Sequence, residues 1–349
     1  MNNWSFGRKA VFCVISSVLA SSLAGIVFIL LNSRIRSLVV AVVTASFICA
    51  LIFFIVSQLL RDKDTKVRII SNIASVVVGF LVIVSTVIIN LAPFIVFPCN
   101  HNEAAYDDLT ELSKVEDSRI SEIRIDDLTG WRISSRSAKP DQKRPVIICF
   151  YGNGMNASAT SLMIFKDKNG IYGDFNENTD FVCVDYPGYG ISGGAPDSDS
   201  VKEMALKVYD EVASWETTSE IILFGYSIGT GIATYTASER DAAGLILWAP
   251  YANAYDIFNN YLNIFYGPCR LLVRFRMDSD KYIKNVDCPV LILASDADEM
   301  VPYQSSRDLF AAADGTAADF VSLSGISHNA FWQDTKALDN TYEFIGEVA

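Results

Sequence analysis

Histidine is nearly absent from this sequence, which has two among its 349 residues, His101 and His328. A reaction that needs an imidazole base can therefore use only one of these two side chains. Cysteine is also sparse, and the five cysteines outside the apolar N-terminal segments follow no metal-ligand spacing. We expect buried free thiols where cysteines fall in apolar strand-like runs, while a disulfide between Cys269 and Cys288 stays possible.

Basic residues are scarce after residue 100. The first hundred residues hold eight Lys or Arg against two Asp, a charge of +6, which leaves −18 for the rest of the chain. A segment this acidic repels the phosphates of nucleic acids and anionic lipid headgroups. We therefore expect neither of them as an electrostatic partner. About 250 residues after that point suit one large domain with a substantial core.

Long apolar runs account for the 51% of hydrophobic residues. Uncharged stretches cover residues 10–31, 37–60 and 69–97, and each reaches the roughly 20 residues that a helix needs to cross about 30 Å of hydrocarbon. The sequence therefore predicts a membrane anchor over residues 1–100 with three transmembrane helices.

The distribution of cations predicts the orientation of this anchor. Six basic residues flank the first span on its N-terminal side and fill the second loop, against two in the first loop. The positive-inside bias then puts the N-terminus in the cytoplasm and the C-terminal domain outside the cell membrane. Alternatively, residues 1–24 form a cleaved signal peptide, which changes the number of spans but not the final side.

The remaining chain alternates short apolar runs with helical patterns. After an acidic linker around residues 102–117, the expected strands are residues 146–150, 181–184, 221–224, 245–248 and 290–294. Continuous apolar runs of this length are typical of strands buried on both faces of a parallel sheet. Helical spacing over residues 200–215 and 303–312 predicts a doubly wound α/β domain over residues 144–349, with a linker and first strands over 101–143.

A Gly-x-Ser-x-Gly pattern, Gly225 to Gly229, directly follows one of these strands and precedes a helix-compatible stretch. A tight turn between strand and helix exposes the hydroxyl of its central residue, Ser227, and requires small neighbours. A serine hydroxyl needs a base to become a nucleophile. His328, in a glycine-containing loop near the C-terminus, is in a position to serve, whereas His101 precedes the domain.

The base needs a carboxylate to orient it, and two candidates follow the strand at 290–294. We prefer Asp298, which precedes a Val-Pro turn, over Asp296. The order Ser, Asp, His is that of α/β-hydrolases. The amide of Ile228 and an amide of the loop 151–156 are candidate donors to an oxyanion. That loop lacks the glycine and lysine spacing of a phosphate-binding loop, and the glycosylation sequon at Asn156 in it is accidental.

These motifs together resemble a known family. The runs 151–154, 185–194, 225–229 and 288–293, followed by Asp298 and His328, resemble membrane-anchored α/β-hydrolases related to the fungal bud-emergence hydrolase and its bacterial relatives. The resemblance implies Ser227 as nucleophile, Asp298 as acid, His328 as base, and the amides of Asn153 and Ile228 as the oxyanion hole. The family usually has histidine where this chain has Tyr151. Because Tyr151 is not one of the three triad residues, this departure bears on the geometry of the loop more than on the reaction.

The aromatic-rich residues 251–285 are in the position where this fold inserts a small helical cap, and they predict an apolar acyl pocket. The predicted function is a membrane-anchored serine hydrolase that cleaves a carboxylic ester, thioester or amide of a small or lipid-like substrate. It needs neither cofactor nor metal. The alternatives are an inactive interaction module tethered to the membrane, a cytosol-facing acyl-protein thioesterase, and a helical transport or assembly partner with an accessory hydrolase.

Overall fold

The computed structural model describes residues 33–59, 64–101, 103–115, 119–139, 142–166, 175–261, 263, 265–273 and 275–349. The chain divides into two compact units, Met1–Ala92 and Pro93–Ala349. The first predicted span, residues 10–31, lies outside the described residues.

The N-terminal unit contains the long helices α2 (Ser33–Leu59) and α3 (Thr65–Val96), the last residues of which extend into the second unit. Among the residues that the structure describes, one helical stretch is long and apolar enough to cross a membrane: Thr65–Val87, with a mean hydropathy of 2.3. The second predicted span falls in α2, where the apolar stretch Ala41–Val56 is shorter.

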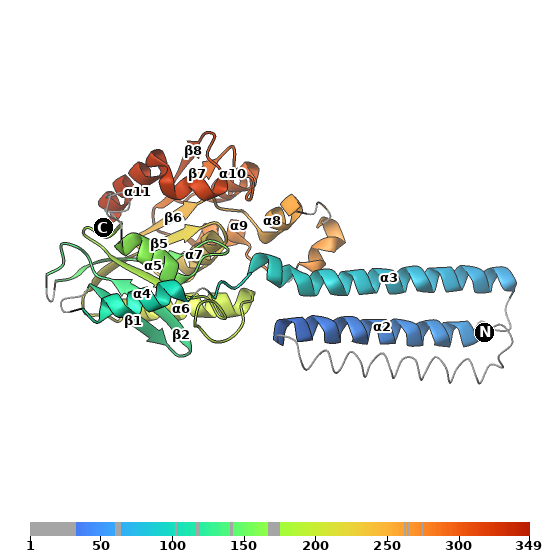
Figure 1. Ribbon diagram of the computed structural model, residues 1–349. Helices are drawn as coiled ribbons and strands as arrows, with labels where there is room; N and C mark the ends of the chain where they lie inside the picture. The colour runs from blue at the N-terminus through green and yellow to red at the C-terminus, as the bar shows by residue number, and fades with distance from the viewer. Residues whose placement is uncertain are drawn as a thin grey trace. The chain divides into compact units, whose positions relative to one another are not determined.

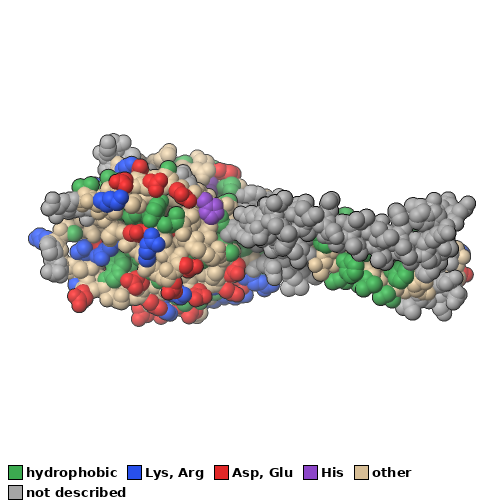
Figure 2. Space-filling view, turned by 60° about the horizontal axis from the view of Figure 1, so that its bottom comes forward, with side chains coloured by type: hydrophobic (Ala, Val, Ile, Leu, Met, Phe, Trp, Pro, Cys, Tyr) green, Lys and Arg blue, Asp and Glu red, His purple; other side chains and the backbone are tan. Residues whose placement is uncertain are grey.

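The surfaces of these two helices are apolar, and two of their hydroxyls bond within the helix. Large side chains such as Phe47, Ile70 and Phe80 are 58 to 67% exposed, and Figure 2 shows apolar side chains gathered on the described part of the helices. The hydroxyls of Ser46 and Thr86 each donate to the carbonyl four residues earlier, at 2.8 Å. A surface of this kind suits a hydrocarbon environment, in which polar groups must be satisfied internally.

The second unit is built on one eight-stranded sheet of order β1-β2-β4-β3-β5-β6-β7-β8. The strands are β1 (Ile120–Ile125), β2 (Leu128–Ile133), β3 (Arg144–Phe150), β4 (Asp180–Val184), β5 (Thr218–Tyr226), β6 (Gly244–Trp248), β7 (Val290–Ser295) and β8 (Ala318–Leu323). Strands β3 to β8 pair in parallel, and β1 and β2 are antiparallel. All five predicted strands are present, and three of them, β4, β6 and β7, are buried along their whole length.

Helices cover both faces of this sheet (Figure 1). They are α4 (Ala104–Ser113), α5 (Ala157–Phe165), α6 (Ser198–Ala213), α7 (Ile228–Glu239), α8 (Ala254–Tyr261), α9 (Ser279–Tyr282), α10 (Tyr303–Ala312) and α11 (Thr335–Val348). Short 3-10 helices are η2 (Gly267–Leu272), η3 (Ile283–Asn285) and η4 (His328–Gln333). Alternation of helices with parallel strands gathers the carboxyl ends of β3 to β8 at one edge, where ligands bind in open α/β sheets.

The acidic segment expected to be a linker forms helix α4. Leu109 is fully buried and packs with Ile120 and Trp131, and the Trp131 indole donates to Ser158 Oγ at 2.9 Å. The acidic side chains predicted a solvated segment, but Leu109, with Tyr106 and Leu112 packed around it, forms an apolar inner face that docks this short helix. Strands β1 and β2, which follow it, add an antiparallel edge to the sheet.

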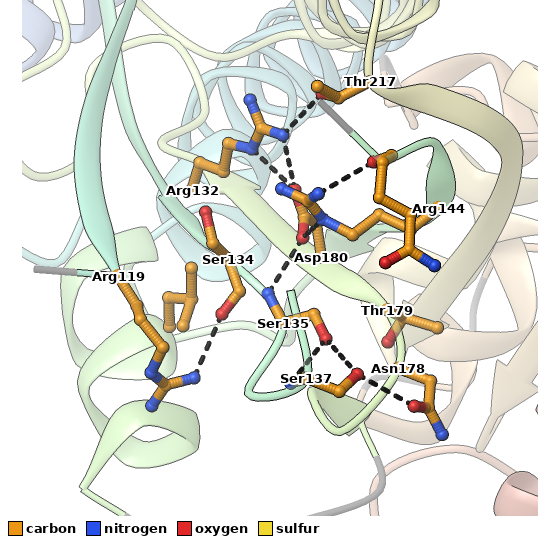
Figure 3. A network of polar contacts seen from close by, with 12 residues as sticks. Arg119, Arg132, Ser134, Ser135, Ser137, Arg144, Asn178, Thr179, Asp180 and Thr217 are labelled. Carbon is orange, nitrogen blue, oxygen red and sulfur yellow. Dashed lines mark hydrogen bonds and ion pairs between the residues drawn. The ribbon is translucent and has the colours of Figure 1, made fainter. Parts of the chain in front are cut away.

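A buried carboxylate, Asp180 at the start of β4, links neighbouring strands at the amino end of the sheet (Figure 3). Its side chain has no exposed surface, and it forms ion pairs with Arg132 from β2 and Arg144 from β3, each at 2.5 Å. The backbone N–H of Ser135 adds a hydrogen bond of 2.9 Å. Because two cations and an amide compensate the buried charge, this network links the antiparallel edge to the parallel strands.

The disulfide that stayed possible between Cys269 and Cys288 is not present: both cysteines are free, Cys269 exposed and Cys288 buried. Burial raises the pKa of the Cys288 thiol to about 11. Cys149 and Cys183 are buried free thiols in adjacent strands, as expected.

Candidate active site

Ser227 occupies a sharp turn between β5 and α7. Its backbone has φ 54° and ψ −120°, a region that a residue with a side chain rarely adopts. The flanking glycines are required by close contacts: a Cβ on Gly229 would lie 2.0 Å from the carbonyl oxygen of Phe150, and one on Gly225 would lie 2.7 Å from Cα of Thr230. The Gly-x-Ser-x-Gly pattern thus makes the strained turn that presents the serine hydroxyl.

The structure brings Ser227, His328 and Asp298 together in one chain of hydrogen bonds. Ser227 Oγ lies 2.9 Å from His328 Nε2, and His328 Nδ1 lies 2.8 Å from Asp298 Oδ2. The side chains of His328 and Asp298 are 7% and 2% exposed. Each residue follows the carboxyl end of a parallel strand, β5, β7 or β8, so the topology converges them on one edge of the sheet.

The geometry distinguishes the two candidate acids. Besides its contact with His328, Asp298 accepts hydrogen bonds from the N–H groups of Met300 and Val301, each at 2.8 Å. Asp296 faces the loop after β8 instead, where it accepts from Gly325 N at 2.8 Å and Ser324 Oγ at 3.1 Å. Asp298 is therefore the carboxylate that can orient the imidazole, and Asp296 holds the loop that carries the histidine.

Two residues near His328 were not identified from the sequence. Tyr226 stacks on the imidazole, with ring centroids 5.3 Å apart and an angle of 24°, and its hydroxyl donates to the carbonyl of His328 at 2.8 Å. Glu299 accepts a hydrogen bond from the backbone N–H of His328 at 3.0 Å. No local pattern signals these roles, because Tyr226 and Glu299 lie 102 and 29 residues from the histidine.

The two predicted oxyanion donors come from the start of α7 and from the loop after β3. Ile228 begins α7, so its N–H has no acceptor within the helix. A Cβ on Gly152 would lie 2.7 Å from the ring of Tyr226 and 3.5 Å from Ser227 Cβ, which shows how closely that loop approaches the serine. Asn153 follows Gly152 in a turn that the Met155 N–H closes on the Gly152 carbonyl at 3.3 Å.

Tyr151, where the family usually has histidine, belongs to a buried polar cluster beside this loop. Its hydroxyl donates to Asp185 at 3.2 Å and accepts from the N–H of Tyr186 at 3.0 Å, and the two tyrosine rings stack at 4.2 Å. Desolvation raises the pKa of Asp185 to about 6, although hydrogen bonds from the N–H of Ala157 and from Tyr151 oppose the shift. Tyr151 thus supports the loop and takes no part in the Ser–His–Asp contact.

The sequon residue Asn156 is fully buried in the same region. Its side chain accepts a hydrogen bond from the N–H of Ala159 and caps α5 at 2.7 Å. A side chain used in this way is inaccessible to glycosylation, in agreement with its assignment as an accidental match.

The segment between β6 and β7, where a cap was predicted, contains the short helices α8, η2, α9 and η3. Phe258, Phe265 and Phe275 are each 4% exposed. The Asn260 side chain donates to the carbonyls of Glu299 and Met300 at 2.7 and 3.1 Å, which joins the cap to the loop that carries Asp298. Within the described residues, no group of three or more His, Cys, Asp or Glu side chains could hold a metal ion.

The chain is similar to known lipases and esterases in sequence or fold. No family model matches the chain. Lysophosphatidylserine lipase ABHD12 from Macaca fascicularis is 30% identical over 149 residues, which cover 38% of this chain and 37% of that protein. The chain spans half or less of the length of the first curated relatives that it matches.

Two solved structures share the fold. Est1E from Butyrivibrio proteoclasticus, with ferulic acid bound, has a TM-score of 0.52 at 20% identity and covers 65% of this chain and 98% of its own. Esterase Pf2001 from Pyrococcus furiosus has a TM-score of 0.51 at 16% identity, over 68% of this chain and 91% of its own.

The chain is a member of the α/β-hydrolase superfamily. The predicted α/β-hydrolase fold is thereby confirmed. Similarity to proteins named lipase and esterase also agrees with the prediction of a hydrolase that acts on ester bonds.

Proposed function

We propose that this protein is a membrane-anchored serine hydrolase that cleaves a carboxylic ester through an acyl-enzyme on Ser227. One observation carries the proposal: the hydrogen-bond chain from Ser227 Oγ through the imidazole of His328 to Asp298, at 2.9 and 2.8 Å, with the serine on a strained turn. An ester is favoured over a thioester or an amide because the named relatives are lipases and esterases.

In the proposed reaction, His328 Nε2 takes the proton of Ser227 as the oxygen attacks the acyl carbon. The resulting oxyanion accepts hydrogen bonds from the amides of Ile228 and Asn153, and Asp298 stabilises the imidazolium through Nδ1. His328 then protonates the departing alcohol. Water, deprotonated by the same nitrogen, releases the acid and restores the serine.

The substrate class follows from the cap and the anchor. The buried aromatic side chains of the cap and the proposed membrane tether favour a lipid-like ester with an uncharged acyl chain, and the strongly acidic catalytic unit disfavours polyanions. The relative named lysophosphatidylserine lipase points in the same direction. The anchor is proposed to have three spans, residues 10–31, 37–60 and 69–97, with the hydrolase domain outside the cytoplasm.

Covalent labelling of the full-length protein tests the mechanism. A fluorophosphonate probe should label the wild type and spare Ser227→Ala, and the wild type should hydrolyse p-nitrophenyl esters whereas Ser227→Ala should not. Ser238→Ala, which alters a serine on the same helix α7 away from His328, is the matched control and should label like the wild type. Equal labelling of the wild type and Ser227→Ala would contradict the proposal.

The exposed thiol of Cys269 tests the orientation. A membrane-impermeant maleimide added to intact cells should label the wild type, and Cys269→Ser should lose that label. Cys288, buried and with its pKa raised to about 11, should stay unmodified in the folded protein. Labelling of Cys269 only after permeabilisation would place the domain in the cytosol and favour an acyl-protein thioesterase.

A further inference from the structure

The five residues Phe97–His101 connect α3 to the rest of the hydrolase unit, and we call them the connecting segment. Phe97 is 1% exposed, and its ring meets the rings of Tyr189 and Phe275 edge-on, with centroids 6.3 and 5.0 Å apart. Cys99 is 8% exposed and has φ 48°, an uncommon backbone conformation for a residue other than glycine. The connecting segment therefore packs into the hydrolase unit in a specific conformation.

Hydrogen bonds join this segment to two loops of the hydrolase unit. The side-chain amide of Asn100 donates to the carbonyl of Gly154 at 2.7 Å. The carbonyl of Asn100 accepts from the N–H of Gly190 at 2.9 Å, and His101 Nδ1 lies 3.2 Å from the carbonyl of Gly190. Asn100 thus bridges the turn that carries Asn153 and the loop after β4.

The tip of the turn, Asn153 and Gly154, is exposed, so packing constrains it less than it constrains the buried Gly152. Asn153 lies between two glycines, which restrict the backbone least. Gly154 has φ 79°, and a Cβ added there would meet no heavy atom within 4 Å among the described residues. The turn is closed by the Met155 to Gly152 hydrogen bond of 3.3 Å, and the shorter bond from Asn100 ties it to a second, well-packed segment.

We propose that Asn100 is a positioning residue for the oxyanion hole: it holds the Gly152–Gly154 turn so that the N–H of Asn153 points at the developing negative charge. The inference rests on the proposed serine hydrolase function. The segment that directly follows the apolar helix α3 then supports the reaction, besides connecting the domain to the proposed membrane anchor.

A displaced turn weakens stabilisation of the transition state more than it weakens binding of the neutral substrate. Complete loss of one oxyanion donor lowers kcat by about 10²- to 10³-fold. Loss of the Asn100 tether leaves the donor present but less well aimed, so we expect a smaller decrease, about tenfold, with KM changed less than twofold.

The test uses full-length protein in detergent, with Asn100→Ala and the isosteric Asn100→Asp, neither of which can donate to Gly154 at neutral pH. Asn340→Asp is the matched control, because its exposed amide donates to a carbonyl at 2.7 Å within α11. Active sites are titrated with a fluorophosphonate, and kcat is expressed per titrated site so that misfolded protein does not count. An alkyl boronic acid, which forms a tetrahedral adduct on the serine, reports on the oxyanion hole.

The expected result is a kcat lowered about tenfold in both Asn100 variants, a boronic acid Ki raised by a similar factor, an unchanged KM and an unaffected Asn340→Asp. If the wild type turns over esters while both variants keep kcat and Ki within twofold per titrated site, the positioning role is overturned and the hydrolase function stands. A fall in the titrated fraction alone, with normal kcat per site, also overturns it, since Asn100 then serves only stability. A wild type without labelling or turnover would overturn both proposals.

Discussion

The sheet buries one carboxylate at the amino ends of its parallel strands, here the amino edge, and another beyond their carboxyl ends, the carboxyl edge. The two carboxylates have different partners. Asp180 at the amino edge has no exposed side-chain surface and pairs with Arg132 and Arg144. Asp298, beyond the carboxyl end of β7, is 2% exposed and pairs with His328, which contacts Ser227. A guanidinium stays charged at any ordinary pH, so the first site can only stabilise the fold. An imidazole can accept a proton on one nitrogen and donate one from the other, so the second site can also do chemistry.

The largest expected effect is on catalysis at the carboxyl edge. Asp298→Asn should lower kcat about 10⁴-fold, because an amide neither holds the imidazole in the required tautomer nor stabilises its charged form. Asp296→Asn is the matched control and should stay within tenfold of the wild type, since Asp296 contacts the loop at Ser324 and Gly325. Ester turnover per titrated site measures both. A larger loss in Asp296→Asn would reverse the assignment of the acid.

The next effect concerns stability at the amino edge. Asp180→Ala should lower the free energy of unfolding of the hydrolase unit by about 3–5 kcal/mol, because it leaves Arg132 and Arg144 partly buried without their partner. Denaturant unfolding of the full-length protein, followed by tryptophan fluorescence, measures the loss. The kcat per titrated site should stay within twofold of the wild type. A catalytic defect without destabilisation would break the contrast between the two edges.

A third buried carboxylate, Asp185, sharpens the comparison because none of its hydrogen bonds comes from a cationic side chain. Burial raises its pKa from the ordinary 3.8 to about 6, so the folded protein binds this proton more tightly than the unfolded chain does. Tighter binding of this proton stabilises the folded state. The stabilisation is complete below pH 3.8 and is lost as the pH rises through about 6. At about 1.4 kcal/mol per pKa unit, it amounts to roughly 3 kcal/mol.

Asp185→Asn should remove this dependence. Between pH 4 and pH 7, the difference in unfolding free energy between the variant and the wild type should therefore change by roughly 2 kcal/mol in favour of the variant, since the unfolded chain is already partly ionised at pH 4. Unfolding curves at the two pH values measure it. Parallel pH dependence in the two proteins would mean that Asp185 ionises normally.

The smallest effect is expected at Glu299, which touches the histidine backbone and not its ring. Glu299→Ala removes the acceptor of the His328 N–H, an interaction worth about 1 kcal/mol, so kcat should fall roughly fivefold. Glu299→Gln keeps an acceptor oxygen and should recover most of the loss. An equal effect of both substitutions would assign the role to the charge of Glu299 instead of its hydrogen bond.

Much of the sheet and part of the site could be predicted because their causes are local. Five apolar runs bounded by turn residues became strands, and the glycines around Ser227 relieve contacts within a few residues or with the adjacent strand β3. His328 could be selected because the chain has a single other histidine. Helix α4 was missed because a short apolar face centred on Leu109, not its acidic surface, decides its packing.

The sequence by itself determined a strained serine turn at the end of a buried strand, an apolar N-terminal region and an acidic C-terminal unit, since each depends on neighbouring residues or on composition. Only the tertiary structure decided which carboxylate meets His328, that Tyr226 and Glu299 support it, and that Asn100 reaches the turn at Gly154. These contacts join residues 29 to 102 positions apart. Their geometry is set by the parallel order of the strands, which no local pattern encodes.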